Sequence, residues 1–304
     1  MSTFLGVDIG GTAVKIGLVD GGGALLRKAE HSVDYDGYRT PILTSVLQAI
    51  SVFLSESGAR PEGIGISAAG QVDVHSGAVV GTCGNLPGWE GTRLTDAMRD
   101  AFSLPAVAMN DANCALLGEQ WVGAAKGRRH VVMITLGTGV GGGILVDGRI
   151  LNGREGLAGE LGHMPLHAGG IQCTCGNRGC YEQYASVTAL VRRAAVVGED
   201  APRSGRAVFD SAATGNERML GILSEWIEDV ASGLVGLIHL LNPELLLIGG
   251  GVSAQDDLLI RPLRERVLGR TMPRFREGLE LEAAALGNDA GMLGAVRHLL
   301  NRHG

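Results

Sequence analysis

The sequence predicts an α/β protein made of two similar halves with a cleft between them. Apolar strands alternate with amphipathic helices along the 304 residues, which is typical of this class. A strand–glycine turn–strand unit also occurs twice, at residues 4–20 and again at 131–147. A shift of 127 residues aligns Gly10 with Gly137 and residues 18–21 with 145–148. We therefore interpret the two units as an internal duplication.

The remaining elements follow from hydrophobic periodicity. Apolar residues recur at helical spacing through 40–54 and 219–241, and short buried strands are expected at 63–68 and 104–109. Further helices are expected at 111–123, 182–197 and 289–300, and a strand at 245–248. We expect an N-terminal domain of residues 1–115 joined by the closing helix, 288–304. Residues 116–287 would form the second domain, with a metal loop at 163–180.

Composition limits the classes of partner and the compartment. The chain carries 26 basic and 32 acidic residues, a formal net charge of −6, which argues against nucleic acid or an anionic membrane as the main partner. No apolar stretch reaches the ~18–20 residues of a membrane span, and the N-terminus does not resemble a signal peptide. The odd count of five cysteines, three of them within eight residues, favours a cytoplasmic protein with metal ligation over a disulfide scaffold.

Three glycine-rich turns directly follow apolar strands, and they suit a polyphosphate ligand. Glycine lets backbone N–H groups approach phosphate oxygens, and threonine adds a hydroxyl donor. Asp8, at the end of the first strand, could hold a water bound to Mg²⁺, and we group Lys15 with the nucleotide-binding residues. The alternative is that the turns only close hairpins. A Rossmann motif requires a helix after the turn, whereas the first two turns return as strands, and no P-loop motif occurs. The predicted turns are Gly10-Gly11-Thr12, Gly137-Thr138-Gly139 and Gly249-Gly250-Gly251.

One histidine and three cysteines predict a structural zinc site. Three thiolates and an imidazole satisfy tetrahedral Zn²⁺, and such a closed site braces a loop rather than activating water. The alternative, buried apolar cysteines, fits poorly with the surrounding threonine, glycine, asparagine and arginine. The predicted ligands are His163, Cys173, Cys175 and Cys180.

Acidic residues in loops are candidate catalytic and binding groups. Asn110-Asp111 follows a predicted strand, where either residue could also serve only as a helix N-cap. Glu160 and Glu182 flank the predicted zinc loop, so metal binding would position them. Each alone could equally be a solvated surface acid.

Taken together, these motifs resemble the ROK (repressor, open reading frame, kinase) family of sugar kinases. They occur in family order from residue 8 to 252. The matching segments are Asp8-Ile9-Gly10-Gly11-Thr12, Asn85-Leu86-Pro87-Gly88-Trp89, Asn110-Asp111, residues 137–143, Glu160-Leu161-Gly162-His163, residues 173–182 and Ile248-Gly249-Gly250-Gly251-Val252.

The resemblance implies an actin-like ATPase (ribonuclease H-like) fold and ATP-dependent phosphorylation of a hexose hydroxyl, usually O6. By that match Asp111 is the general base, His163 contacts both sugar and zinc, and Gly249 to Gly251 lie against the adenosine. The family also implies a homodimer or homotetramer. The residues that the match assigns to the sugar hydroxyls are Asn85, Asn110, Glu160, His163 and Glu182.

Other functions stay open at this point. A sugar-sensing repressor would need a helix-turn-helix, for which the sequence before the first strand leaves no room. An actin-like filament or chaperone ATPase would use the phosphate turns but not Asn110-Asp111 or the zinc loop. A polyphosphate donor is possible in the family, although no strongly basic stretch supports it.

The identity of the sugar is also open. Residues 85–89 look like the glucokinase loop, whereas Tyr181-Glu182-Gln183-Tyr184-Ala185-Ser186 looks like branches that include N-acetylmannosamine and β-glucoside kinases. Glucose is placed slightly ahead of N-acetylmannosamine. Cys83 and Cys114 have no assigned role.

Overall fold

The chain forms two compact units in a computed structural model that describes residues 2–34, 36–82 and 86–303. Unit 1 consists of Met1–Gly127, Ile150–Ala158 and Asn288–Gly304, and unit 2 of Arg128–Arg149 and Gly159–Gly287. Residue 115, after which the sequence analysis divides the domains, lies inside a helix that belongs wholly to unit 1.

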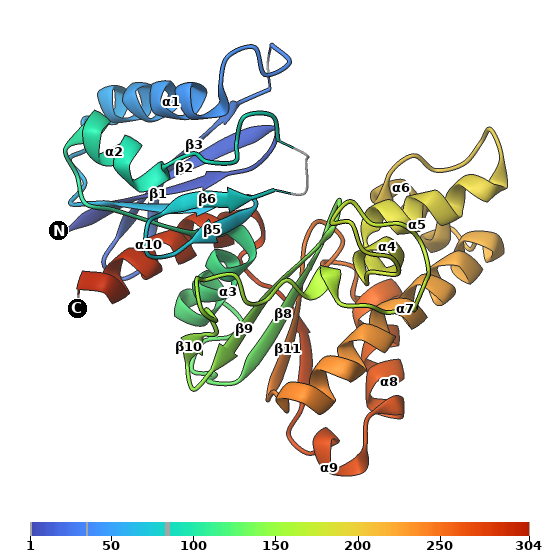
Figure 1. Cartoon of the computed structure of the whole chain (residues 1–304). Coiled ribbons are helices and arrows are strands. Elements are labelled where there is room, and N and C mark those ends of the chain that lie inside the picture. The colour runs from blue at the N-terminus through green and yellow to red at the C-terminus, as the bar shows by residue number, and fades with distance from the viewer. Residues whose placement is uncertain (1, 35, 83–85, 304) are drawn as a thin grey trace. The chain divides into compact units, whose positions relative to one another are not determined.

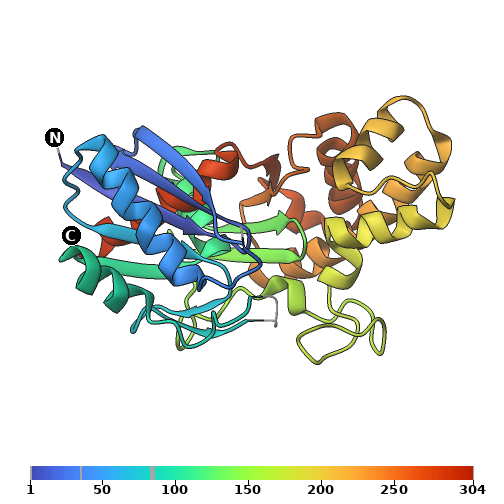
Figure 2. The same ribbon diagram turned by 90° about the horizontal axis from the view of Figure 1, so that it is seen from above.

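Unit 1 is built on a five-stranded mixed sheet of order β3-β2-β1-β4-β7. β2 pairs antiparallel with β1 and β3, whereas β1, β4 and β7 are parallel. Figures 1 and 2 show α1 on one face of this sheet and α10 on the other. The elements are β1 (Thr3–Ile9), β2 (Ala13–Asp20), β3 (Leu25–Ser32), α1 (Ile42–Ser57), β4 (Ile64–Ala68), β5 (Gln71–Asp73), β6 (Ala78–Gly81), α2 (Leu94–Phe102), β7 (Ala106–Asn110), α3 (Asp111–Val122) and α10 (Ala290–His303).

Unit 2 repeats this sheet, with the order β10-β9-β8-β11-β12. Its hairpin β8–β9 is antiparallel and β8, β11 and β12 are parallel, as in unit 1. The predicted α/β fold with a duplicated hairpin is thus confirmed. The second turn is one residue shorter, because Leu136 pairs with Val140 whereas Ile9 pairs with Val14. The strands are β8 (Val131–Leu136), β9 (Val140–Val146), β10 (Arg149–Ile150), β11 (Leu245–Gly249) and β12 (Glu280–Ala283).

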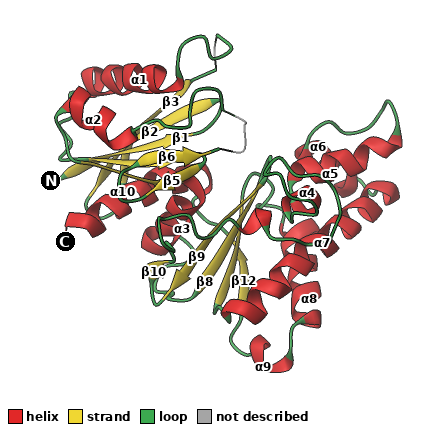
Figure 3. Ribbon diagram, in the orientation of Figure 1, coloured by secondary structure: helices red, strands yellow, loops and turns green. Residues whose placement is uncertain are grey.

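The helices of unit 2 gather on one side of its sheet (Figure 3). The largest core of the unit lies between this sheet face and α7, around the fully buried Trp226. A 3₁₀ turn, Leu161–His163, and a π turn, Asp256–Ile260, lie in the loops. The helices are α4 (Glu182–Ala185), α5 (Val187–Ala194), α6 (Gly205–Ala213), α7 (Glu217–Leu241), α8 (Arg261–Arg270) and α9 (Pro273–Arg276).

One expected helix is two. Ser186 interrupts the segment 182–197 with an extended backbone, and its hydroxyl accepts a hydrogen bond from the Ala189 N–H. Serine stabilises a helix start more than a helix interior, so α5 begins afresh after it.

Glycines bring α10 against the strands of unit 1. A Cβ on Gly6 of β1 would lie 2.5 Å from the Met292 carbonyl oxygen, and one on Gly65 of β4 would collide with the Ala295 carbonyl. The helix backbone therefore lies directly on β1 and β4. Among the described residues, none of the helices combines the length and the apolar character needed to cross a lipid bilayer.

Replacing Gly65 with alanine should therefore destabilise the protein by about 1–3 kcal/mol, because backbone atoms must move to admit the methyl group. Urea denaturation of Gly65→Ala measures the loss. The matched control is Gly221→Ala on the exposed face of α7, where nothing lies within 4 Å of the added Cβ. There the gain in helix propensity should raise stability by up to about 1 kcal/mol. A Gly65→Ala protein as stable as wild type would contradict this packing.

Candidate active site

The parallel strands of unit 1 bring two acidic groups to one edge of the sheet. Asp8 on β1 lies opposite Ser67 on β4, and Ala68 lies opposite Asn110, the last residue of β7. Carboxyl ends of parallel strands meet at the same edge, and two strand spacings separate β1 from β7 by about 10 Å. Asp8 and Asp111 therefore flank one stretch of this edge.

Asp8 is held in a mostly buried position, with its side chain 19% exposed. Its Oδ1 accepts a hydrogen bond of 2.6 Å from the Ser67 hydroxyl, and its Oδ2 lies 3.6 Å from Lys15 Nζ. Burial raises the pKa of Asp8 above its usual value, and the Ser67 hydrogen bond and the Lys15 charge oppose that shift. Asp8 and Lys15, which the sequence analysis grouped separately as nucleotide-binding residues, thus form an ion pair.

Hydrogen bonds fix the backbone of the Gly10–Thr12 turn. The Gly10 N–H donates to the Ala13 carbonyl at 3.0 Å, and the Val33 N–H donates to the Thr12 carbonyl at 2.9 Å. The Tyr38 hydroxyl donates to the Gly11 carbonyl at 2.7 Å. Tyr38 was not foreseen, and its φ of +62° places it in a region that side chains rarely adopt. Strained residues of this kind are often found next to ligand sites.

Asn110 and Asp111 lie at the start of α3, where the sequence left open which of them caps the helix. Asn110 is the N-cap of α3, since its Oδ1 accepts from the Ala112 and Asn113 N–H groups, and its Nδ2 donates to the Gly70 carbonyl at 2.9 Å. Asp111 is the first residue of the helix, and it is exposed. Asp111 Oδ1 also accepts from the Ala112 N–H, at 2.8 Å, so both side chains contact the first turn of α3 and Asn110 is its N-cap.

Asn85 falls outside the described residues. Leu86, the next residue, packs against the Gly10–Thr12 turn, because a Cβ on Gly11 would lie 2.9 Å from its Cδ2. Trp89 is buried and donates to the Ala69 carbonyl at 2.8 Å. The Leu86–Trp89 segment therefore lies against the same edge of the sheet.

In unit 2, two of the predicted glycine turns lie together. The Gly137 N–H donates to the Gly139 carbonyl at 3.1 Å and closes the second hairpin, with Thr138 exposed at its tip. Gly250, with a φ of +93°, lies so close to the Leu136 carbonyl that only glycine fits. The Gly249–Gly251 segment is thereby placed directly beside the Gly137–Gly139 turn.

The four predicted zinc ligands also come together. Their ligand atoms all lie within 4.8 Å of one another, with Cys175 and Cys180 sulfurs 3.6 Å apart and His163 Nδ1 3.7 Å from the Cys173 sulfur. Tetrahedral Zn²⁺ with bonds of about 2.3 Å places its sulfur ligands about 3.8 Å apart, so the residues fit the ion. Burial raises the pKa of Cys180 to about 12, a cost to the thiolate that a cation would offset.

Glu182 connects this cluster to the second glycine turn. Its Oε1 lies 3.1 Å from the Cys173 sulfur and 3.8 Å from His163 Nδ1. Its Oε2 lies 2.6 Å from where a Cβ on Gly139 would be. On the other side of the imidazole, His163 Nε2 lies 3.9 Å from a Glu160 carboxylate oxygen. The two acids therefore flank His163 rather than standing alone in solvent.

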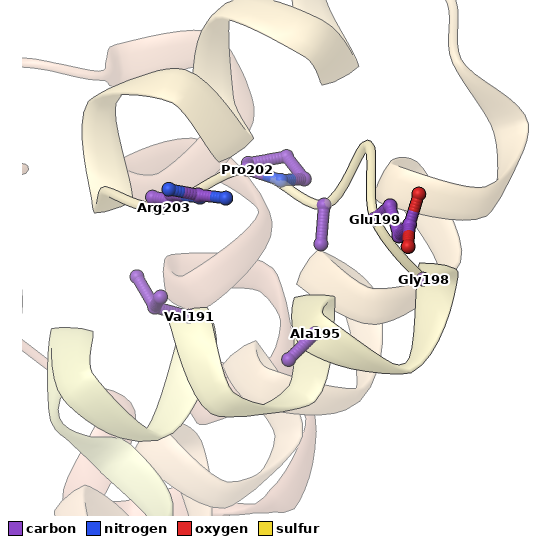
Figure 4. Close-up of a pocket in the computed structure, with 7 residues that line it drawn as sticks. Val191, Ala195, Gly198, Glu199, Pro202 and Arg203 are labelled. Atoms are coloured by element: carbon purple, nitrogen blue, oxygen red, sulfur yellow. The ribbon is translucent and has the colours of Figure 1, made fainter.

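A separate pocket of about 320 Å³ lies between the end of α5 and the loop that leads to α6 (Figure 4). Its lining includes Val191, Pro202 and Arg203, and none of the predicted site residues.

Comparison with known proteins identifies the family, because residues 4–302 match the family described as ROK. The chain belongs to the ROK family. The glucokinase of Thermotoga maritima is 35% identical over 99% of this chain and 98% of its own length. The crystal structure of a ROK family glucokinase from Streptomyces griseus, solved with glucose and AMPPNP, is 33% identical with a TM-score of 0.84, and both chains are covered completely.

A putative N-acetylmannosamine kinase from Listeria monocytogenes is 28% identical with a TM-score of 0.85, covering 99% of this chain and all of its own. The chain is thus a sugar kinase of the ROK family, and its histidine and cysteine cluster agrees with the zinc motif of that family.

If the ROK cluster holds zinc, the purified protein should contain one Zn²⁺ per chain, and Cys175→Ser should lose it because a tetrahedral site needs its fourth ligand. Elemental analysis after dialysis measures the content. Cys114→Ala is the control, since Cys114 lies in unit 1 and outside the cluster. Full zinc retention by Cys175→Ser would contradict the assigned ligand set.

Proposed function

We propose that this ROK kinase transfers the γ-phosphoryl group of ATP to the 6-hydroxyl of a hexose, with glucose as the preferred substrate. The observation that carries the proposal is the place of Asp111, an exposed carboxylate at the same sheet edge as Asp8, at the start of a helix whose N-cap is Asn110. The glucose and AMPPNP bound to the Streptomyces griseus glucokinase support the choice of substrates.

Asp111 acts in this proposal as the general base. A sugar hydroxyl is a poor nucleophile until a carboxylate within ~2.6–3.2 Å accepts its proton. The hydroxyl oxygen then forms the new bond to the γ-phosphorus while the bond to the β-phosphate oxygen breaks, leaving ADP. Asn110 fixes the start of α3 and so sets the direction of the Asp111 side chain.

The glycine turns bind the phosphates. Backbone N–H groups of Gly10 to Thr12 and Gly137 to Gly139, with the two exposed threonine hydroxyls, donate to phosphate oxygens. Gly249 to Gly251 lie against the adenosine. Mg²⁺, when bound with ATP, would neutralise phosphate charge, and Asp8 with its partner Lys15 would hold the water ligands of that ion.

The sugar hydroxyls are bound in this proposal by the polar residues that the family resemblance assigns to them. Asn85 and Asn110 donate from unit 1, and the carboxylates of Glu160 and Glu182 accept charge-assisted hydrogen bonds. His163 turns Nδ1 toward the cysteines, and its Nε2, which lies 3.9 Å from a Glu160 carboxylate oxygen, is the nitrogen that we assign to the sugar. The metal cluster therefore orients both His163 and Glu182.

Tyr181 bears on the choice between glucose and N-acetylmannosamine. In the sequence, the segment that begins with Tyr181 looked like branches that include N-acetylmannosamine and β-glucoside kinases. In the structure, the Tyr181 side chain is fully buried, packs on Gly233 of α7 and donates to the Val230 carbonyl at 2.6 Å. The tyrosine is therefore a core residue, and its presence is no argument against glucose. The Listeria relative keeps N-acetylmannosamine as the second candidate.

Replacing Asp111 with asparagine should lower kcat by about 10²–10⁴-fold, the usual contribution of a general base, while glucose still binds. A coupled assay for ADP measures kcat, and isothermal titration measures glucose binding. Asp100→Asn, an exposed acid on α2, makes the same change of charge as a control. Activity of Asp111→Asn within about tenfold of wild type would contradict the general-base role.

Glucose should give the highest kcat/KM in a panel with N-acetylmannosamine, N-acetylglucosamine, mannose and cellobiose. The same assay with polyphosphate in place of ATP tests the donor. A higher value for N-acetylmannosamine would move the proposal to the second candidate. ATP binding without phosphorylation of any sugar would instead favour an ATPase that acts on no sugar.

A further inference from the structure

Ser67 is the one polar residue of β4, whose sequence is Ile-Gly-Ile-Ser-Ala and whose residues are all buried. Its side chain is fully inaccessible to solvent. A buried hydroxyl has a free-energy cost unless it forms a hydrogen bond, so a serine in such a strand calls for a partner.

That partner is Asp8. The two residues are directly opposite in the parallel register of β1 and β4, and the Ser67 hydroxyl donates to Asp8 Oδ1 at 2.6 Å. The distance is in the range of charge-assisted O–H···O⁻ hydrogen bonds, which are about twice as strong as neutral ones.

The other neighbours of Asp8 leave its two oxygens in different surroundings. A Cβ on Gly291 of α10 would lie 2.7 Å from Oδ1 and 3.1 Å from the Ser67 oxygen, so the helix backbone encloses Oδ1. Lys15 on β2 faces Oδ2 at 3.6 Å. From α3, burial raises the pKa of the Cys114 thiol well above its usual value, and the charges of Asp8 and Asp111 add to that shift.

We propose that Ser67 is a positioning residue for phosphoryl transfer: it fixes the Asp8 carboxylate through Oδ1 and so presents Oδ2 to the magnesium–nucleotide complex. This inference rests on the role of Asp8 in the proposed function. It assigns a task to a residue that belongs to none of the motifs by which the family was identified.

The physical basis is the position of the Asp8 carboxylate between β1 and α10. The Ser67 hydrogen bond and the Gly291 backbone both hold Oδ1, so Oδ2 is the oxygen turned toward Lys15. Removing the hydroxyl should therefore let the carboxylate rotate and misplace Oδ2.

The test is Ser67→Ala, measured by the Mg²⁺ concentration that gives half-maximal rate and, separately, by the KM for glucose. Loss of a hydrogen bond to a charged group should raise that Mg²⁺ concentration about tenfold or more. The KM for glucose should stay as in wild type.

Two further variants separate this role from packing. Ser45→Ala is the matched control, because Ser45 is also buried, in α1, and its hydroxyl has no hydrogen-bond partner among the described residues. Ser67→Cys keeps the shape of the side chain but donates only weakly. It should shift the Mg²⁺ dependence in the same direction as Ser67→Ala.

Asp8→Asn distinguishes failure of this inference from failure of the proposed function. If Asp8→Asn changes the Mg²⁺ dependence while Ser67→Ala behaves like Ser45→Ala, the Ser67 proposal alone is overturned. Wild-type behaviour of Ser67→Cys beside an impaired Ser67→Ala would also overturn it, in favour of packing. If Asp8→Asn leaves the Mg²⁺ dependence unchanged, the role of Asp8 fails and the Ser67 proposal fails with it.

Discussion

The close approach of α10 to the sheet of unit 1 is the constraint on which the position of Asp8 depends. Gly6 and Gly65 admit the helix backbone onto β1 and β4, and Gly291 leaves just enough room beside Asp8 Oδ1. The same contact that packs the unit therefore buries most of a carboxylate. A buried carboxylate needs compensation, which Ser67 and Lys15 provide from the neighbouring strands. The packing of α10 and the surroundings of the Asp8 carboxylate are thus coupled.

Unit 2 depends on a different chain of contacts. The histidine and cysteine cluster lies against Glu182, and Glu182 lies against Gly139 of the second hairpin turn. A metal that fixes the cysteine loop would thereby also fix an acid proposed to bind sugar and a turn proposed to bind phosphate. This explains how a closed metal site, which activates no water, can still matter for transfer.

Local sequence patterns predicted the elements and the family, because hairpins, caps and metal spacings are local. The duplicated hairpin, the close approach of the four predicted zinc ligands and the Asn110 cap are all found in the structure. Features set by distant contacts could not be read in this way: the strained Tyr38 over Gly11, the burial of Tyr181 on Gly233, and the pairing of Ser67 with Asp8. Tyr181 shows the risk most clearly, since a residue taken as a hint about the sugar is part of the core.

The central claim is that Asp111 accepts the proton of the hydroxyl that receives the phosphoryl group. The most direct measurement is a crystal structure of the wild-type protein with glucose and a non-hydrolysable ATP analogue. The account predicts an Asp111 carboxylate oxygen within about 2.6–3.2 Å of the glucose 6-hydroxyl, on the side away from the leaving ADP. A complex in which Asp111 contacts no sugar hydroxyl, while another base does, would contradict it.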